Sequence, residues 1–162
     1  FLMSTYTEFI KQSIEFMNQN LPRIRKCLIA ISEEELWQHP NEQSNSIGNL
    51  IIHLCGNITQ YIHSGLGNEP DIRERDLEFN RTGGLTRDEL YTKIEAVTHL
   101  AVKILEKLPE KQALKKREIQ GFKMSGIGII IHATEHYSYH VGQITFYTKL
   151  MKNIDLAYYE EL

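Results

Sequence analysis

Four long segments of the chain carry apolar residues at alternating spacings of three and four, the pattern of helices that each bury one face. The first segment runs from about Thr5 to Ile31. Its apolar residues form the heptad-like seam that bundle helices require: Ile10, Ile14, Met17, Leu21, Ile24, Leu28 and Ile31. Pro22 lies inside this seam, and because the pattern continues in register beyond it, we expect a kink and not a helix end.

The other three helices are predicted over residues 47–64, 86–108 and about 125–152. Thr5-Tyr6-Thr7-Glu8 and Thr86-Arg87-Asp88-Glu89 have the Thr-x-x-Glu form of a capping box, which satisfies amides at a helix start. Ser32 is expected to cap a short turn and Ser125 to cap the last helix. Glycines 65 and 67 and a proline at 109 supply stop signals for the second and third helices.

No segment shows sustained period-two alternation, so the sequence predicts an all-α protein, an up-and-down four-helix bundle. A chain of 162 residues suits one domain, and we expect residues 1–162 to form it. Phe1 and Leu2 precede a methionine, and we interpret Met3 as the native start. Residues 111–123 are expected to be a basic connection. Residues 66–85 lack periodicity and contain the charged cluster Arg73-Glu74-Arg75-Asp76; a loop this long is often functional.

Composition narrows the classes of partner. The net charge of −3 argues against nucleic acid as the main partner, because phosphate binding needs a basic face. No apolar run approaches the ~18 residues that span a bilayer, so no membrane partner is expected. The start has neither a basic n-region nor an apolar h-region, and we expect a cytoplasmic protein. Cys27 and Cys55 do not form a CxxC pair; we interpret them as buried apolar residues, with a reactive thiol or a disulfide as alternatives.

The last predicted helix carries three histidines, His132, His136 and His140, spaced one turn apart. His136 and His140 fall in the middle of its apolar stripe, where we expect burial to be greatest, and two imidazoles at i and i+4 can aim at one metal ion. His132 and His140 are about 12 Å apart along the helix axis, so all three cannot hold the same ion. The alternative is a structural pair whose rings hydrogen-bond within the core.

A third ligand would have to come from another helix, and the second predicted helix offers two candidates. His53 lies at the margin of its apolar stripe, and His63 lies near its end, where we expect more solvent. Periodicity does not choose between them. His39 and His99 have no partner in sequence and are interpreted as surface or capping residues.

Two segments resemble signatures of a known superfamily. Residues 45–57, NSIGNLIIHLCGN, resemble the second-helix signature of the DinB-like superfamily, and residues 135–144, EHYSYHVGQI, resemble its fourth-helix signature. Three further segments make the chain most similar to the DUF1572 branch: SGLG at 64–67, RERDLEF at 73–79 and TKL at 148–150.

The resemblance implies a four-helix bundle with a three-histidine metal site formed by His53, His136 and His140. His132 then becomes a neighbouring residue, and His63 is not a ligand. The superfamily includes metal-dependent transferases and isomerases that use low-molecular-weight thiols, and homodimers are common in it. Asn49, Asn57 and Gln143 are either partners of the ligands or plain surface amides.

Three neutral imidazoles leave open coordination positions, as in a catalytic site. We expect zinc or nickel, with iron, manganese or copper as alternatives. The leading hypothesis is therefore a metal-dependent enzyme, a transferase using a small thiol or a hydrolase. The alternative is a non-catalytic metal- or ligand-binding protein of the stress response. Arg73 and Arg75 could hold a carboxylate of a thiol, although a solvated or dimer-face cluster is favoured, and Tyr158 and Tyr159 are candidates for a dimer face.

Overall fold

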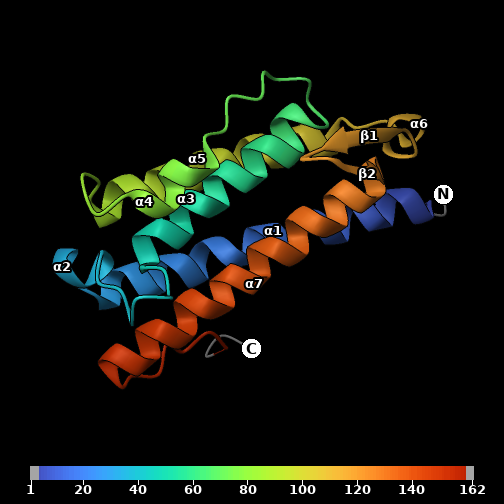
Figure 1. Ribbon diagram of the computed structural model, residues 1–162. Helices are drawn as coiled ribbons and strands as arrows, with labels where there is room; N and C mark the ends of the chain where they lie inside the picture. Colours follow the sequence, from blue (N-terminus) through green and yellow to red (C-terminus); the bar gives the residue numbers. More distant parts are fainter. Residues whose placement is uncertain (1–3, 160–162) are drawn as a thin grey trace.

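The structure is a computed structural model that describes residues 4–159, so the interpretation of Phe1 and Leu2 concerns residues outside the described range. Its four long helices are α1 (Thr5–Ala30), α3 (Ile47–Ile58), α5 (Arg87–Glu106) and α7 (Gly126–Lys152). The helix α1 packs against α5 and α7, and α3 packs against the same two helices, so the four enclose one core (Figure 1). The predicted all-α class and four-helix bundle are confirmed.

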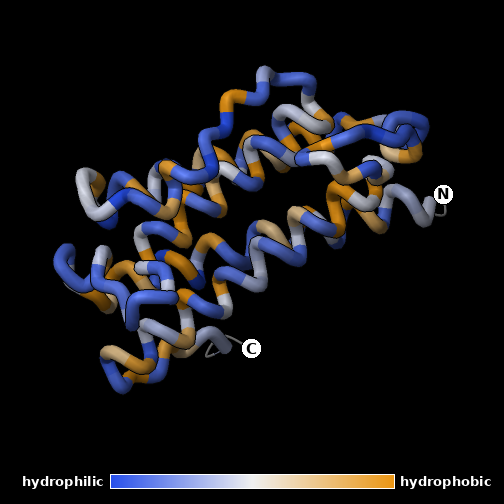
Figure 2. The backbone as a smooth tube through the Cα atoms, viewed as in Figure 1, coloured by the Kyte–Doolittle hydropathy of each residue, from blue (hydrophilic) through white to orange (hydrophobic). Residues whose placement is uncertain are grey.

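The core contains the residues that the spacing pattern predicted. Apolar residues recur turn by turn along the helices in Figure 2. Met17, Ile24, Ile51, Ile94 and Ile144 are fully buried. Both cysteines are buried and free, which confirms their interpretation as apolar residues and excludes a disulfide between them in this structure. Among the described residues, no helix has the length and apolarity needed to cross a membrane.

The helix starts show three correct predictions of caps and one error. Capping boxes are present at Ser32 and Thr86, and Ser125 caps α7. The predicted box at Thr5 is wrong, because Thr5 is already helical and Ser4 is the cap. The Ser4 side chain accepts a hydrogen bond from the Thr7 amide at 3.1 Å. Serine is as good a cap as threonine, so the pattern alone did not distinguish two adjacent candidates.

The second predicted helix reaches Ser64, as expected, but its last six residues form a π-helix, η1 (Thr59–Ser64). Gly65 then bonds its amide to the Gln60 carbonyl at 3.1 Å, and the chain turns away. Gly67 is required in this turn, because a Cβ there would lie 2.7 Å from Ile104 Cδ1. The stop signals therefore act where the sequence placed them.

The connection after η1 runs back along the outside of α3 and carries a short helix, α4 (Arg75–Asn80), that packs on α3 (Figure 1). As a result α3 and α5 run in the same direction, while α1 with α3 and α5 with α7 keep the expected up-and-down order. The predicted loop over 66–85 is therefore partly helical. An isolated helix of six residues is unstable in water, so α4 depends on tertiary contacts that local pattern does not reveal.

The chain between α5 and α7 corrects a second expectation. Residues 111–125 contain the end of α6 (Glu110–Ala113) and an antiparallel hairpin of β1 (Lys116–Ile119) and β2 (Phe122–Ser125), so the expected connection over 111–123 is largely structured. Its two-residue turn has positive φ at both positions, 53° at Gln120 and 80° at Gly121, as in the type I′ turns that join twisted strands. The remaining short helix is α2 (Glu33–Leu36).

Candidate metal centre

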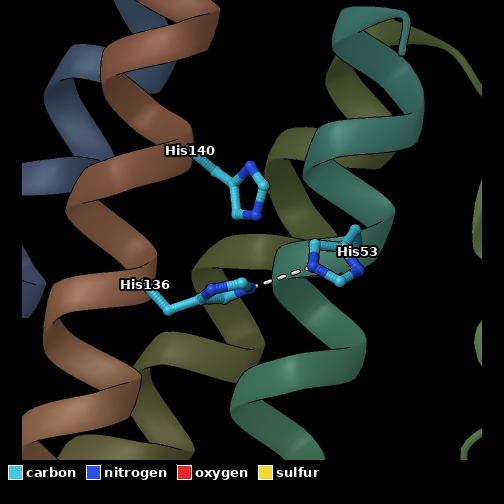
Figure 3. Close-up of side chains that lie close together, drawn as sticks. All are labelled: His53, His136 and His140. Carbon is cyan, nitrogen blue, oxygen red and sulfur yellow. Dashed lines mark hydrogen bonds between the residues drawn. The ribbon is translucent and has the colours of Figure 1, made fainter. Parts of the chain in front are cut away.

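The three predicted ligand residues meet between α3 and α7. His136 and His140 project from α7 toward His53 on α3, as Figure 3 shows. One ring nitrogen from each residue lies within 4.8 Å of the others, and His53 Nε2 is 2.9 Å from His136 Nε2. Zinc–imidazole bonds are about 2.0–2.1 Å long, so small rotations of these rings would bring all three nitrogens onto one ion. His63, the alternative third ligand, is not in this group.

His53 is oriented by a carboxylate that the sequence analysis did not assign to the site. Glu78 Oε2, on α4, is 2.8 Å from His53 Nδ1. Burial disfavours ionisation of Glu78, but hydrogen bonds from Arg73 and His53 and the charge of Arg73 outweigh it and lower the pKa of the carboxyl. An ionised carboxylate only accepts hydrogen bonds, so His53 Nδ1–H donates to it. The Nε2 lone pair then faces the other two histidines and is free to bind a metal.

Arg73 also holds the Glu78 carboxylate, and its Nη2 lies 3.2 Å from His53 Nδ1. Its Nε lies 2.7 Å from Oε1 and its Nη2 2.9 Å from Oε2, a two-pronged pairing. Its Nη1 donates to Gln60 Oε1 at 2.9 Å. The Arg73 side chain is 4% exposed, which contradicts the expectation of a solvated charge at this position. It is also not free to hold a carboxylate of a thiol.

His140 has its own partner within α7. Its Nδ1 is 2.6 Å from Gln143 Oε1, an amide oxygen that accepts a hydrogen bond from the ring N–H. This bond fixes the tautomer of His140 with its Nε2 lone pair available, the form that a metal requires. Gln143 is therefore a hydrogen-bond partner of His140 and not a plain surface amide.

The remaining histidine of the cluster, His136, is the least fixed. Because His53 Nε2 carries no proton, His136 Nε2–H is the donor in their shared hydrogen bond. Binding of an ion would move this proton to Nδ1, for which no hydrogen-bond partner is found among the described residues. His136 is also half-buried, because it lies at the edge of the buried face of α7 and not at its centre, where the sequence analysis placed it.

The site favours neutral imidazoles. Burial, reinforced by neighbouring His140 and His53, lowers the pKa of His136 to about 3. Burial likewise lowers the pKa of His140 to about 4, although the bond to Gln143 opposes the shift. Neutral rings near pH 7 keep their lone pairs, so the donor set fits a divalent cation of the zinc or nickel type.

A polar pair lies one helical turn from the cluster, on the side of the hairpin. Asn57 Nδ2 is 3.4 Å from His132 Nε2, and the His132 ring lies between two others, stacked on His136 and tilted against Tyr61. Burial lowers the pKa of His132. His132 is thus a neighbour of the site, as the resemblance implied, and Asn57 contacts it.

His39, His63, His99 and Asn49 lie outside the three-histidine cluster. His63 is 5% exposed and bonds through Nε2 to the Val97 carbonyl at 2.9 Å, so the expectation of a wetter position is wrong. His39 and His99 are exposed, as expected. Asn49 is buried, and its Nδ2 donates to the carbonyls of Glu78 and Arg81 at 2.9 and 2.7 Å, so it supports the end of α4.

Comparison with known proteins gives a family and a fold. The family described as "Protein of unknown function (DUF1572)" matches residues 4–159. A DinB-like protein from Bacillus subtilis is 21% identical, with a TM-score of 0.65 over 86% of this chain and 91% of that one. A DinB-like protein from Bacillus cereus is 16% identical, with a TM-score of 0.70 over 90% and 94%.

A conserved protein from Enterococcus faecalis is 15% identical, with a TM-score of 0.76 over 94% of this chain and 99% of that chain. No curated protein matches the chain significantly. At these identities the solved structures establish the DinB-like bundle fold and carry no information on activity.

Proposed function

This chain belongs to the DUF1572 family, and from that premise we propose that it is a divalent-metal-dependent enzyme whose ligands are His53, His136 and His140. One observation carries the proposal: three imidazole nitrogens from two helices converge within 4.8 Å, and two of the rings are held by hydrogen bonds at Nδ1. A structural pair of histidines would not require a third, carboxylate-oriented ring from another helix.

The ligand set determines the kind of chemistry. A divalent ion held by three neutral imidazoles would act as a Lewis acid toward a bound water or thiol, with zinc or nickel the best suited. The protein itself orients the ligands: Glu78 fixes the His53 ring and Gln143 fixes the His140 ring. Tyr139 packs edge-on against His140 at a centroid distance of 5.0 Å and covers that side of the ring.

We propose that the site activates a small thiol or another small nucleophile for transfer to an electrophilic substrate, or activates water for the hydrolysis of such a substrate. Among the charged groups near the three histidines, Arg73 is engaged with Glu78 and Gln60, so recognition of an anionic thiol would depend on other residues.

A non-catalytic metal-binding protein is the second candidate, and one observation favours it. Glu78, the carboxylate that contacts the ligands, is already bound by both Arg73 and His53. It is therefore not a free general base. Under this alternative the protein binds a metal or a ligand without turnover.

A turnover assay distinguishes the metal-dependent enzyme from the non-catalytic binding protein. Zinc- or nickel-loaded protein is mixed with cellular thiols and electrophilic partners, and with ester substrates for hydrolysis. Turnover that disappears together with the metal in His136→Ala supports the enzyme. If this variant lost its metal yet kept full activity, the metal mechanism would be wrong, and tight metal binding with no turnover would favour the binding protein.

We also propose a homodimer that uses the exposed side of α7. Ile131, Tyr139, Phe146 and Leu150 are each more than half exposed there. The sequence also suggested Tyr158 for the dimer face. Its hydroxyl is bonded within the chain, because it contacts Cys27 Sγ and Thr145 Oγ1 at 3.2 and 2.8 Å. We expect Phe146→Glu to convert a dimer to a monomer in light scattering, and a wild-type monomer would contradict the proposal.

A further inference from the structure

The connection between α3 and α5 is joined to the metal ligands through one side chain. Glu78 lies on α4, outside the four-helix bundle, yet it is only 6% exposed and its carboxylate reaches His53. Burial of a charged carboxylate costs free energy unless it is paired, and here both oxygens are paired by Arg73 from the same connection. Glu78 therefore contacts His53 as one partner of an ion pair with Arg73.

Helix α3 leaves room for the Glu78–Arg73 ion pair. A Cβ on Gly56 would lie 1.9 Å from Glu78 Oε1 and 3.0 Å from Arg73 Nε, so any larger residue would displace the carboxylate. One helical turn before His53, Asn49 is bonded to the backbone carbonyls of Glu78 and Arg81. Beyond Gly56, Gln60 accepts from Arg73 and donates to Asp71 Oδ2 at 2.9 Å. Asn49 and Gln60 thus hold the connection on both sides of the carboxylate, and Gly56 leaves the space that the carboxylate occupies.

We propose that Glu78 and Arg73 are positioning residues for the metal site, and that docking of residues 71–81 on α3 is coupled to metal binding through His53. This inference rests on the proposed metal site but adds residues and a segment to it. With the segment docked, His53 Nδ1–H is held by Glu78 and Nε2 points at the ion. With the segment displaced, the His53 ring is free to rotate and to exchange tautomers, and a share of the binding free energy goes into ordering it.

Coupling of this kind is reciprocal. If docking of the segment increases metal affinity by a given factor, the metal stabilises the docked segment by the same factor. The metal should therefore protect residues 71–81, although none of its three ligands lies in that segment. A merely structural role of the Glu78–Arg73 pair would stabilise the protein and leave metal affinity unchanged.

Two glycine variants test the coupling without removing any functional group. Gly56→Ala places a methyl group against the carboxylate, whereas Gly142→Ala on α7 meets nothing within 4 Å. Zinc affinity is measured by competition with a chelator, and cobalt-loaded samples report ligand geometry by their visible spectra. We expect Gly56→Ala and Glu78→Ala to lower zinc affinity about 10- to 100-fold, the usual effect of losing a partner of a ligand. Glu78→Gln should lose less, because its amide oxygen still accepts from His53, and Gly142→Ala should match wild type.

Hydrogen exchange supplies the second readout. In wild type, zinc should slow exchange of amides in residues 71–81, and in Glu78→Ala this protection should disappear while the bundle helices remain protected. Wild-type zinc affinity in Gly56→Ala and Glu78→Ala, with His136→Ala impaired, would overturn the coupling and leave the metal site standing. Absence of zinc binding in wild type would instead overturn the proposed function.

Discussion

Two histidines of the same continuous helix are equally buried and yet differ in what they can do. His53 and His63 are each 5% exposed. His63 donates to the Val97 carbonyl, and this one bond satisfies a neutral ring in a core. His53 faces two other imidazoles on one side and a carboxylate on the other. Burial therefore does not distinguish a candidate metal ligand from a histidine that only packs in the core; the convergence of ring nitrogens does.

The largest expected difference between the two positions is in metal affinity. We expect His53→Ala to weaken zinc binding by more than about 100-fold, beyond the effect of losing a partner of a ligand, because a coordinating nitrogen itself is lost. His63→Ala should leave zinc affinity unchanged. Competition with a chelator measures the zinc affinity of both variants. Equal losses of affinity in the two would contradict the distinction between His53 as a metal ligand and His63 as a core residue.

In metal-free protein, His63→Ala should lower the free energy of unfolding more than His53→Ala does. His63→Ala leaves the buried Val97 carbonyl without its donor and opens a cavity, so the free energy of unfolding should fall by about 2 kcal/mol. Urea denaturation without metal measures this loss. Added zinc should stabilise His63→Ala as much as it stabilises wild type, and a variant that zinc no longer stabilises would place His63 in the site.

A smaller effect is expected from the partner of His140. Gln143→Ala removes the hydrogen-bond acceptor that holds Nδ1, and zinc affinity should fall about tenfold. Gln38→Ala is a suitable control, because its hydrogen bond to α7 is made by its backbone carbonyl, which accepts from the Tyr147 hydroxyl at 3.3 Å and is kept in the variant. A Gln143→Ala variant with wild-type affinity would mean that packing alone orients His140.

The smallest effect should appear in the pH dependence of stability. In the unfolded chain a histidine takes up a proton as the pH falls below about 6.5. Folded His136 stays neutral until about pH 3, so the unfolded state binds more protons in between and stability is lost as the pH falls through that range. Replacing His136 by Asn should flatten this dependence in metal-free protein.

His63→Asn should flatten the pH dependence of stability less than His136→Asn does. Burial lowers the pKa of His63 as well, but the Val97 carbonyl and Glu69 oppose the shift, whereas the neighbours of His136 reinforce it. Urea unfolding at pH 5 and pH 7 compares the two variants. A larger flattening in His63→Asn would show that the cluster at His136 is more polar than the structure indicates.

Much of the bundle follows from local pattern. Periodic apolar residues placed the four long helices, and caps such as Ser32 and Ser125 marked two starts, because helix periodicity and capping act over a few residues. The short helix α4 and the hairpin at Gln120 and Gly121 were missed. Both depend on contacts with distant segments, although the glycine of the turn was a local signal that could have been used.

The site, too, could be predicted only in part from local pattern. Spacing on α7 supplied His136 and His140, and the resemblance supplied His53, which spacing could not separate from His63. Glu78 and Arg73 lie in the segment that resembles the DUF1572 branch, but no local pattern assigns a carboxylate in a loop to a histidine 25 residues earlier. Only the path of the connection along α3 reveals that contact.

The most direct test of the central claim is the metal content of the protein, purified without a histidine tag or a nickel column. Elemental analysis of wild type should find about one zinc or nickel per chain. The same analysis should find almost none in His136→Ala and an undiminished content in His63→Ala. A wild-type protein without metal, or a content that is equal in all three, would contradict the assignment of His53, His136 and His140 as a metal site.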